Sequence, residues 1–102
     1  GWIGVEVQDI TPELAETFKM RKTSGVLIAG VLRGGPADRA GVKPGDILLE
    51  ISGKPVDDST DMLNQVSSLL PGKVAALKIL RNQTEAQLHV SIGKRPKARQ
   101  NN

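Results

Sequence analysis

The chain alternates short apolar runs with stretches rich in glycine, proline and polar residues. The clearest periodic signal lies in residues 85–92, where Ala86, Leu88, Val90 and Ile92 alternate with polar side chains and predict a half-buried strand. Four further strands are predicted where apolar segments are bounded by turn residues. These segments are residues 5–8, 26–32, 47–51 and 74–81.

Two short helices are predicted from their boundary residues. Thr11 followed by Pro12 is typical of an N-cap with proline at the first helical position, so we expect a helix over residues 12–19. A second helix of one or two turns is expected between Pro36 and Gly41, because proline is favoured at the start of a helix and glycine at its end.

The main helix is expected over residues 59–70. The carboxylates of Asp57 and Asp58 favour a helix start at this point, and Pro71 with the glycine after it favours a stop. Together these elements predict an α+β fold. We expect a small, partly open β-barrel or sandwich of five or six strands, capped by one main helix and one or two short helices.

The length of 102 residues predicts one domain. The core must be aliphatic, since Trp2 and Phe18 are the only aromatic residues, and the absence of cysteine excludes disulfides and thiolate-bound metals. Four of the 14 basic residues lie in residues 94–102, so the rest of the chain is close to neutral. We therefore expect a domain over residues 1–93 with a basic polar tail over residues 94–102, and no nucleic-acid partner.

The residues that could carry chemistry favour structural roles. His89, the only histidine, falls on the polar side of its predicted strand, and Asp57, Asp58 and Asp61 gather where helix capping explains acidic residues. Gly34 and the glycine after it lack the Lys-Ser/Thr pair of a phosphate-binding loop. We expect no catalytic residue, no metal site and no cofactor in this chain. Because the first residue is not Met, we expect a longer parent protein.

Residues 34–53 carry a more specific motif. A Gly-Pro-Ala-x-x-Ala-Gly pattern is followed by Pro-Gly-Asp and by a strand that ends in Ser-Gly. This motif resembles the central signature of PDZ domains, and more narrowly that of the PDZ domains of HtrA-type, DegS-like periplasmic serine proteases. The resemblance extends over residues 1–93 and implies the bacterial, circularly permuted PDZ arrangement, with a carboxylate-binding loop near the start and residues 85–92 as the closing strand.

The opening residues match the loop of that family in which a glycine lies between hydrophobic residues. Successive backbone N–H groups around Gly4 would point into one concavity and hold a C-terminal carboxylate, and the strand after the loop would have an open edge that accepts a peptide as an added strand. The resemblance thereby assigns peptide binding to Trp2, Ile3, Gly4, Val5, Glu6 and Val7.

One face of the main helix completes the expected binding groove. Ser59, Leu63 and Val66 recur at helical spacing, whereas Met62 and Leu69 are better placed for the core. We expect Leu63 and Val66 to form the floor of a pocket for the last peptide residue. The sequence shows no Lys or Arg beside the loop, so the carboxylate would be held by N–H groups alone unless a basic residue precedes Gly1.

The resemblance implies a regulatory domain that is not itself an enzyme. Its partners would be the hydrophobic C-termini of misfolded envelope proteins, such as outer-membrane porins, and the serine protease domain of the same chain. The domain would be monomeric by itself. Its parent would be a homotrimer in the periplasm, anchored to the inner membrane and active in the envelope stress response.

Two alternatives stay open. The same signature would suit a PDZ domain of an intramembrane protease or of a secretion-system component, which sequence upstream of Gly1 would distinguish. A structural assembly module is the other alternative, in which the groove is filled by this chain or by a neighbouring chain. Titration with a free peptide distinguishes that module from a peptide receptor.

Overall fold

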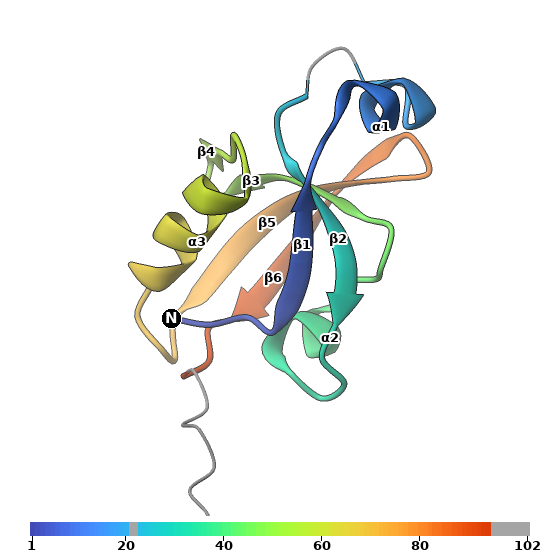
Figure 1. Cartoon of the computed structure of the whole chain (residues 1–102). Coiled ribbons are helices and arrows are strands. Elements are labelled where there is room, and N and C mark those ends of the chain that lie inside the picture. The colour runs from blue at the N-terminus through green and yellow to red at the C-terminus, as the bar shows by residue number, and fades with distance from the viewer. Residues whose placement is uncertain (21–22, 95–102) are drawn as a thin grey trace, which may run out of the picture.

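The computed structural model describes residues 1–20 and 23–94. Its main feature is an antiparallel sheet with the strand order β1-β2-β3-β5-β6, to which β4 adds by pairing with β3 (Figure 1). The strands are β1 (Val5–Asp9), β2 (Val26–Val31), β3 (Ile47–Ile51), β4 (Lys54–Pro55), β5 (Val74–Arg81) and β6 (Thr84–Ser91). The sheet is not closed into a barrel, and the α+β class is confirmed, with six strands and three helices within the described residues.

The helices begin where the predicted capping residues lie. They are α1 (Pro12–Thr17), α2 (Pro36–Ala40) and α3 (Ser59–Ser67). The Thr11 side chain accepts a hydrogen bond from the backbone N–H of Leu14, and the Asp58 carboxylate accepts one from the N–H of Asp61. Gly41, with φ of 95°, ends α2 in the left-handed conformation that glycine adopts most easily.

Two helices end earlier than the sequence predicted. Helix α1 stops at Thr17 because Lys19 adopts a φ of 56°, and the N–H of Met20 then bonds to the carbonyl of Ala15 at 2.7 Å. Helix α3 stops at Ser67, and the hydroxyl of Ser68 donates to the carbonyl of Gln65. The N–H of Leu69 then bonds to the carbonyl of Val66 at 3.0 Å instead of to that of Gln65, and the regular helix ends three residues before the predicted end.

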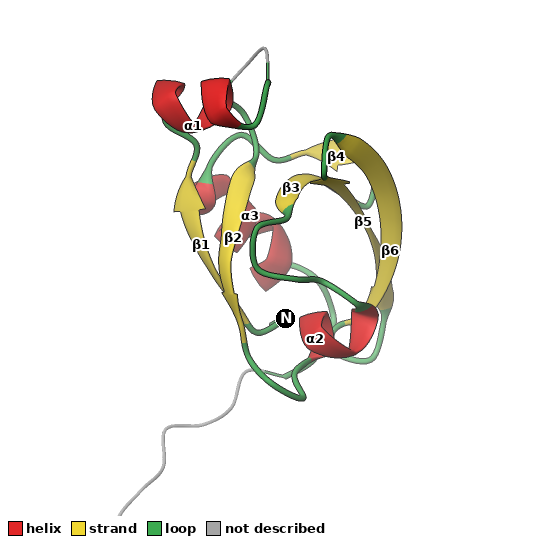
Figure 2. Cartoon of the chain, turned by 90° about the vertical axis from the view of Figure 1, so that its right-hand side faces the viewer, coloured by secondary structure: helices red, strands yellow, loops and turns green. Residues whose placement is uncertain are grey.

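The core lies inside the curve of the sheet, with α3 covering one opening and α2 the other (Figure 2). Its fully buried members come from β2, β3, β5 and β6 and include Val26, Ile28, Leu48, Leu77, Ile79 and Val90, whereas Val5 and Val7 of β1 are only partly buried against it. The predicted alternation of the last strand holds at Val90 and Ile92, which are buried, but fails at Ala86, which is exposed. The first part of β6 pairs with β5 and lies outside the core.

An ion pair joins the turn before β3 to the end of β5. The side chain of Asp46 is buried and accepts hydrogen bonds from Nε and Nη2 of Arg81 at 2.8 and 2.6 Å. The Arg81 pKa is raised, chiefly by this side-chain hydrogen bond. Because the Asp46 carboxylate also accepts the N–H of Lys43 at 2.8 Å, the Pro-Gly-Asp turn of the sequence motif is held in one conformation.

Among the described residues, no helix has the length and hydropathy required to cross a membrane. Of the expected basic tail over residues 94–102, only Lys94 lies within the described residues.

Candidate peptide-binding groove

A groove lies between β1 and α3. Strand β1 pairs with β2 along one edge, and within the described residues its other edge has no partner strand (Figure 1). Helix α3 runs beside that open edge and packs against β1. The two walls of the groove are therefore an unpaired strand edge and one face of a helix, which is the geometry that accepts a peptide as an added strand.

Three carbonyl groups determine how the loop before β1 is oriented. The carbonyl of Trp2 accepts the N–H of Gly93 at 2.9 Å, that of Ile3 accepts the N–H of Ala37 at 2.8 Å, and that of Gly4 accepts the N–H of Leu32 at 3.0 Å. All three acceptors are thus engaged with other parts of the fold. Gly4 permits this course of the chain because its φ is +77°, a conformation that other residues rarely adopt.

The N–H groups of the same peptide units point the opposite way. In a trans peptide the N–H is antiparallel to the carbonyl, so the N–H groups of Ile3, Gly4 and Val5 are directed away from the three donors named above. Within residues 1–20 and 23–94, the N–H groups of Ile3 and Gly4 have no hydrogen-bond acceptor. Successive free N–H groups in one loop form a concavity suited to an anion such as a carboxylate.

A pocket of about 170 Å³, most of whose lining side chains are apolar, lies beside this loop. Its lining residues are Gly1, Trp2, Ile3, Gly4, Val5, Met62, Leu63, Val66 and Ser67. Six of the nine residues that the sequence assigned to peptide binding are therefore brought together here. Met62, which the sequence assigned to the core alone, also reaches the pocket, as does Ser67. Helical spacing pointed to this face of α3 but did not show that a core residue would also contribute to its surface.

The two apolar residues assigned to the pocket floor differ in their exposure. Leu63 is 59% exposed, whereas Val66 is 5% exposed and belongs to the core as well as to the pocket lining. Leu63 therefore presents a large apolar side chain to solvent beside the loop, where the side chain of a partner can cover it. The pocket therefore combines a loop that has free N–H groups with an apolar surface, which suits the last residue of a polypeptide.

The other predicted residues lie further along the groove. Glu6 and Val7 continue β1 beyond the loop, and Ser59 lies at the opposite end of the groove from the pocket. There, the Asp9 carboxylate accepts the backbone N–H of Ser59 at 2.7 Å. This bond joins the end of β1 to the start of α3 and sets the width of the groove at that end.

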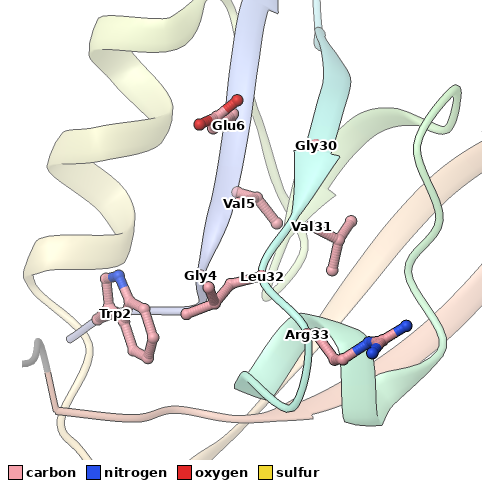
Figure 3. A pocket seen from close by; sticks show the side chains of 8 residues that line it. All are labelled: Trp2, Gly4, Val5, Glu6, Gly30, Val31, Leu32 and Arg33. Carbon is pink, nitrogen blue, oxygen red and sulfur yellow. The ribbon is translucent and has the colours of Figure 1, made fainter.

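A second pocket, of about 400 Å³, lies on the outer face of β1 and β2 (Figure 3). Its lining residues are Trp2, Gly4, Val5, Glu6, Gly30, Val31, Leu32 and Arg33. It shares Trp2, Gly4 and Val5 with the smaller pocket, so the two hollows lie on either side of the loop. Arg33 lines this pocket together with Gly4, a proximity that the sequence did not suggest, but its guanidinium points away from Gly4 (Figure 3).

The groove holds donors, acceptors and apolar surface. No group of three or more His, Cys, Asp or Glu side chains placed to hold a metal ion occurs among the described residues. His89 is exposed on β6 and lines neither of the two pockets beside the loop. The arrangement suits reversible binding of an extended peptide through its backbone and its free C-terminus.

Comparison with protein families supports this interpretation. The family model described as "PDZ domain" matches residues 1–92. A protein of Ectopseudomonas mendocina named "Probable periplasmic serine endoprotease DegP-like" is 40% identical over 96 residues, which are 94% of this chain and 20% of that protein. A protein of the same name from Halomonas elongata is 41% identical over the same lengths. The chain thus spans about a fifth of the curated relatives that it matches.

Solved structures show the same likeness. The HtrA-type protease AlgW with decapeptide matches with a TM-score of 0.86 and 42% identity, covering 96% of this chain and 30% of that chain. The HtrA3 PDZ domain bound to the phage-derived ligand FGRWV matches with a TM-score of 0.74 and 26% identity, covering 88% of this chain and 82% of that chain. The resemblance to the PDZ domains of HtrA-type periplasmic proteases, predicted from residues 34–53, is confirmed.

Proposed function

The chain belongs to the PDZ domain family, whose model matches residues 1–92, and we propose that it is a regulatory domain that captures the free C-terminal ends of other polypeptides. One observation carries this proposal. The carbonyls of the loop are hydrogen-bonded to other parts of the fold, so the N–H groups of Ile3, Gly4 and Val5 point the opposite way. These N–H groups lie beside the pocket and the open edge of β1. An anion-binding loop, a pocket and a strand edge in this order match the carboxylate, last side chain and backbone of a bound C-terminus.

The proposed binding mode assigns separate roles to the loop N–H groups, the pocket and the open edge of β1. The peptide carboxylate accepts hydrogen bonds from the loop N–H groups, and the last side chain enters the pocket lined by Leu63, Val66 and Met62. The peptide backbone then runs antiparallel to β1, past Glu6 and Val7, toward Ser59. Backbone hydrogen bonds supply affinity that is independent of sequence, whereas the pocket selects an apolar last residue.

The similarity to DegP-like endoproteases and to AlgW supports a parent of the HtrA type. In this proposal the domain lies in the periplasm, in the same chain as a serine protease domain, and the parent is a homotrimer anchored to the inner membrane. The captured ligands are hydrophobic C-termini of misfolded envelope proteins, including outer-membrane proteins. The domain acts as the sensor of an envelope stress response and supplies no catalytic residue.

Control of a protease by such a sensor has a thermodynamic condition. A bound peptide shifts the protease toward its active state only if the peptide binds the domain more tightly in that state. The free energy available for regulation is therefore a difference between two affinities. Residues that contact the peptide and also the protease domain are the ones expected to set this difference.

The experiment that tests the binding mode is an NMR titration of the ¹⁵N-labelled chain with an acetylated pentapeptide that ends in Val. We expect the largest amide shift changes at Ile3 to Val7 and along α3, because these groups line the groove. Amides around Asn82, in the turn between β5 and β6, should not move and serve as an internal reference. Shift changes centred on that turn, with none at Ile3 to Val7, would overturn the proposed site.

A further inference from the structure

Glu6 is placed to read a second residue of the ligand. In β1 the side chains of Val5 and Val7 pack against the core, so the side chain between them projects from the opposite, outer face of the sheet. Glu6 is exposed and lines the outer pocket of about 400 Å³ (Figure 3). Within the described residues, its carboxylate takes part in no ion pair.

The pairing of β1 with β2 fixes which backbone groups face the open edge. Val5 lies opposite Val31, and the bond from the N–H of Leu32 to the carbonyl of Gly4 makes this a non-hydrogen-bonded pair. The N–H and carbonyl of Val5 therefore point away from β2, toward the groove. Glu6 pairs in register with Gly30, so its backbone groups face β2 instead, and the register of β1 with β2 shifts only beyond it, between Glu6 and Val7.

This alternation sets the register of an added strand. When the last peptide residue bonds to the backbone of Val5, the penultimate residue lies directly opposite Glu6. Residues that are directly opposite in an antiparallel pair project from the same face, with Cβ atoms about 4.5–5.5 Å apart. The penultimate side chain is thus turned away from the pocket at Leu63 and projects beside the Glu6 carboxylate.

The surroundings of Glu6 favour a long basic side chain at that position. Its neighbour on β2 is Gly30, and Glu6 Oε2 lies 3.2 Å from the position that a Cβ atom of Gly30 would occupy, so no side chain competes for the carboxylate there. Nearer the loop, the ring of Trp2 lies close to Gly4 and lines both pockets. An aliphatic stem can pack on this ring while its cationic end reaches the carboxylate.

We propose that Glu6 is a specificity-determining residue that selects Lys or Arg as the penultimate residue of the ligand. The proposal rests on the proposed function, because it requires a peptide strand on the open edge of β1. The proposal adds a preference for charge at the penultimate ligand residue to the preference for an apolar last residue. The preferred ligands end in a basic residue followed by an apolar residue, and ligands with an acidic penultimate residue are disfavoured by repulsion from Glu6.

Three acetylated pentapeptides test the inference. They end in Lys-Val, Gln-Val and Glu-Val and are otherwise identical, and their affinities are measured by isothermal titration calorimetry with the whole chain. We expect the Lys peptide to bind about two- to five-fold more tightly than the Gln peptide, and the Glu peptide to bind more weakly than either. Raising the salt concentration should reduce these differences, because the interacting charges are exposed.

Substitutions assign the preference to Glu6. In Glu6→Gln the three affinities should agree within about two-fold, and in Glu6→Lys their order should reverse. Glu16→Gln, which makes the same change of net charge at an exposed position on α1, should keep the wild-type order. An unchanged order in Glu6→Gln, or equal affinities in the wild type, would overturn the inference. Failure of all three peptides to bind would instead contradict the proposed function.

Discussion

The carboxylate of Asp9, the last residue of β1, accepts a hydrogen bond from the backbone N–H of Ser59, the first residue of α3, at a distance of 2.7 Å. The two residues are 50 positions apart in the chain, yet this bond connects the two walls of the groove. At the other end, the loop N–H groups of Ile3 and Gly4 have no such partner among the described residues. The groove is therefore fixed at one end and open to an anion at the other.

Removal of this connection should loosen the start of α3. We expect Asp9→Ala to lower the free energy of unfolding by about 1 kcal/mol, because the backbone N–H of Ser59 loses its acceptor and the start of α3 loses a favourable negative charge. Asp9→Asn, whose side-chain oxygen can still accept the bond, should retain most of the stability. Urea denaturation of the three proteins measures the difference. If Asn and Ala were equally destabilising, the hydrogen bond would not be the source of the effect.

The loop conformation at Gly4 should be required for both folding and binding. Alanine at this position would hold a φ of +77° and bring its Cβ to 3.2 Å from Cζ2 of Trp2. We expect Gly4→Ala to lower the free energy of unfolding by about 1–2 kcal/mol, and to weaken peptide binding by about ten-fold or more. Denaturation and calorimetry on the same samples separate the two effects.

Gly72→Ala is the matched control for the loop. Gly72 has a φ of +88° and an added Cβ would meet no atom within 4 Å, so the variant carries similar backbone strain at a residue that lines neither pocket beside the loop. It should lose stability without losing peptide affinity. Equal loss of affinity in both variants would mean that Gly4→Ala acts through general destabilisation.

The exposed leucine of the pocket offers a test that leaves the core intact. Leu63→Glu places a charge where the last peptide side chain and the carboxylate are expected, and should weaken binding by about ten-fold or more. Because Leu63 is 59% exposed, the free energy of unfolding should change by less than about 0.5 kcal/mol.

Leu70→Glu is the control for this change. Leu70 is 64% exposed and does not line the pocket, so its replacement alters the charge and surface polarity to the same extent without affecting the ligand. Affinity should be unchanged in this variant. Comparable weakening by the two substitutions would contradict the placement of the last ligand residue at Leu63.

Much of the fold could be predicted from residues that favour the start or the end of a helix. The structure reproduces the helix boundaries predicted at Thr11 with Pro12, at Pro36 with Gly41, and at Asp58. Each of these residue types has a local preference for the start or the end of a helix. The end of α1 did not follow, since Lys19 has no intrinsic preference for its left-handed conformation. Lys19 keeps this conformation where the N–H of Met20 donates a hydrogen bond to the carbonyl of Ala15 and where apolar residues pack beneath α1.

The groove shows a similar limit of sequence reasoning. Helical spacing pointed to Leu63 and Val66, but spacing alone did not reveal that Val66 is almost fully buried or that Met62 also lines the pocket. The directions of the loop N–H groups likewise could not be predicted from the periodicity of the sequence. They depend on acceptor carbonyls that bond to Ala37 and Gly93, which are distant in the chain and meet the loop only in the fold.

The measurement that tests the central claim most directly compares two forms of one peptide. A pentapeptide ending in Val is titrated with its C-terminus as a free carboxylate and, separately, as a carboxamide, with the fluorescence of Trp2, the only tryptophan, as the signal. Because the loop N–H groups of Ile3, Gly4 and Val5 are expected to hold a charged carboxylate, the amide should bind at least about ten-fold more weakly. Equal affinity of the two forms would contradict the assignment of this loop.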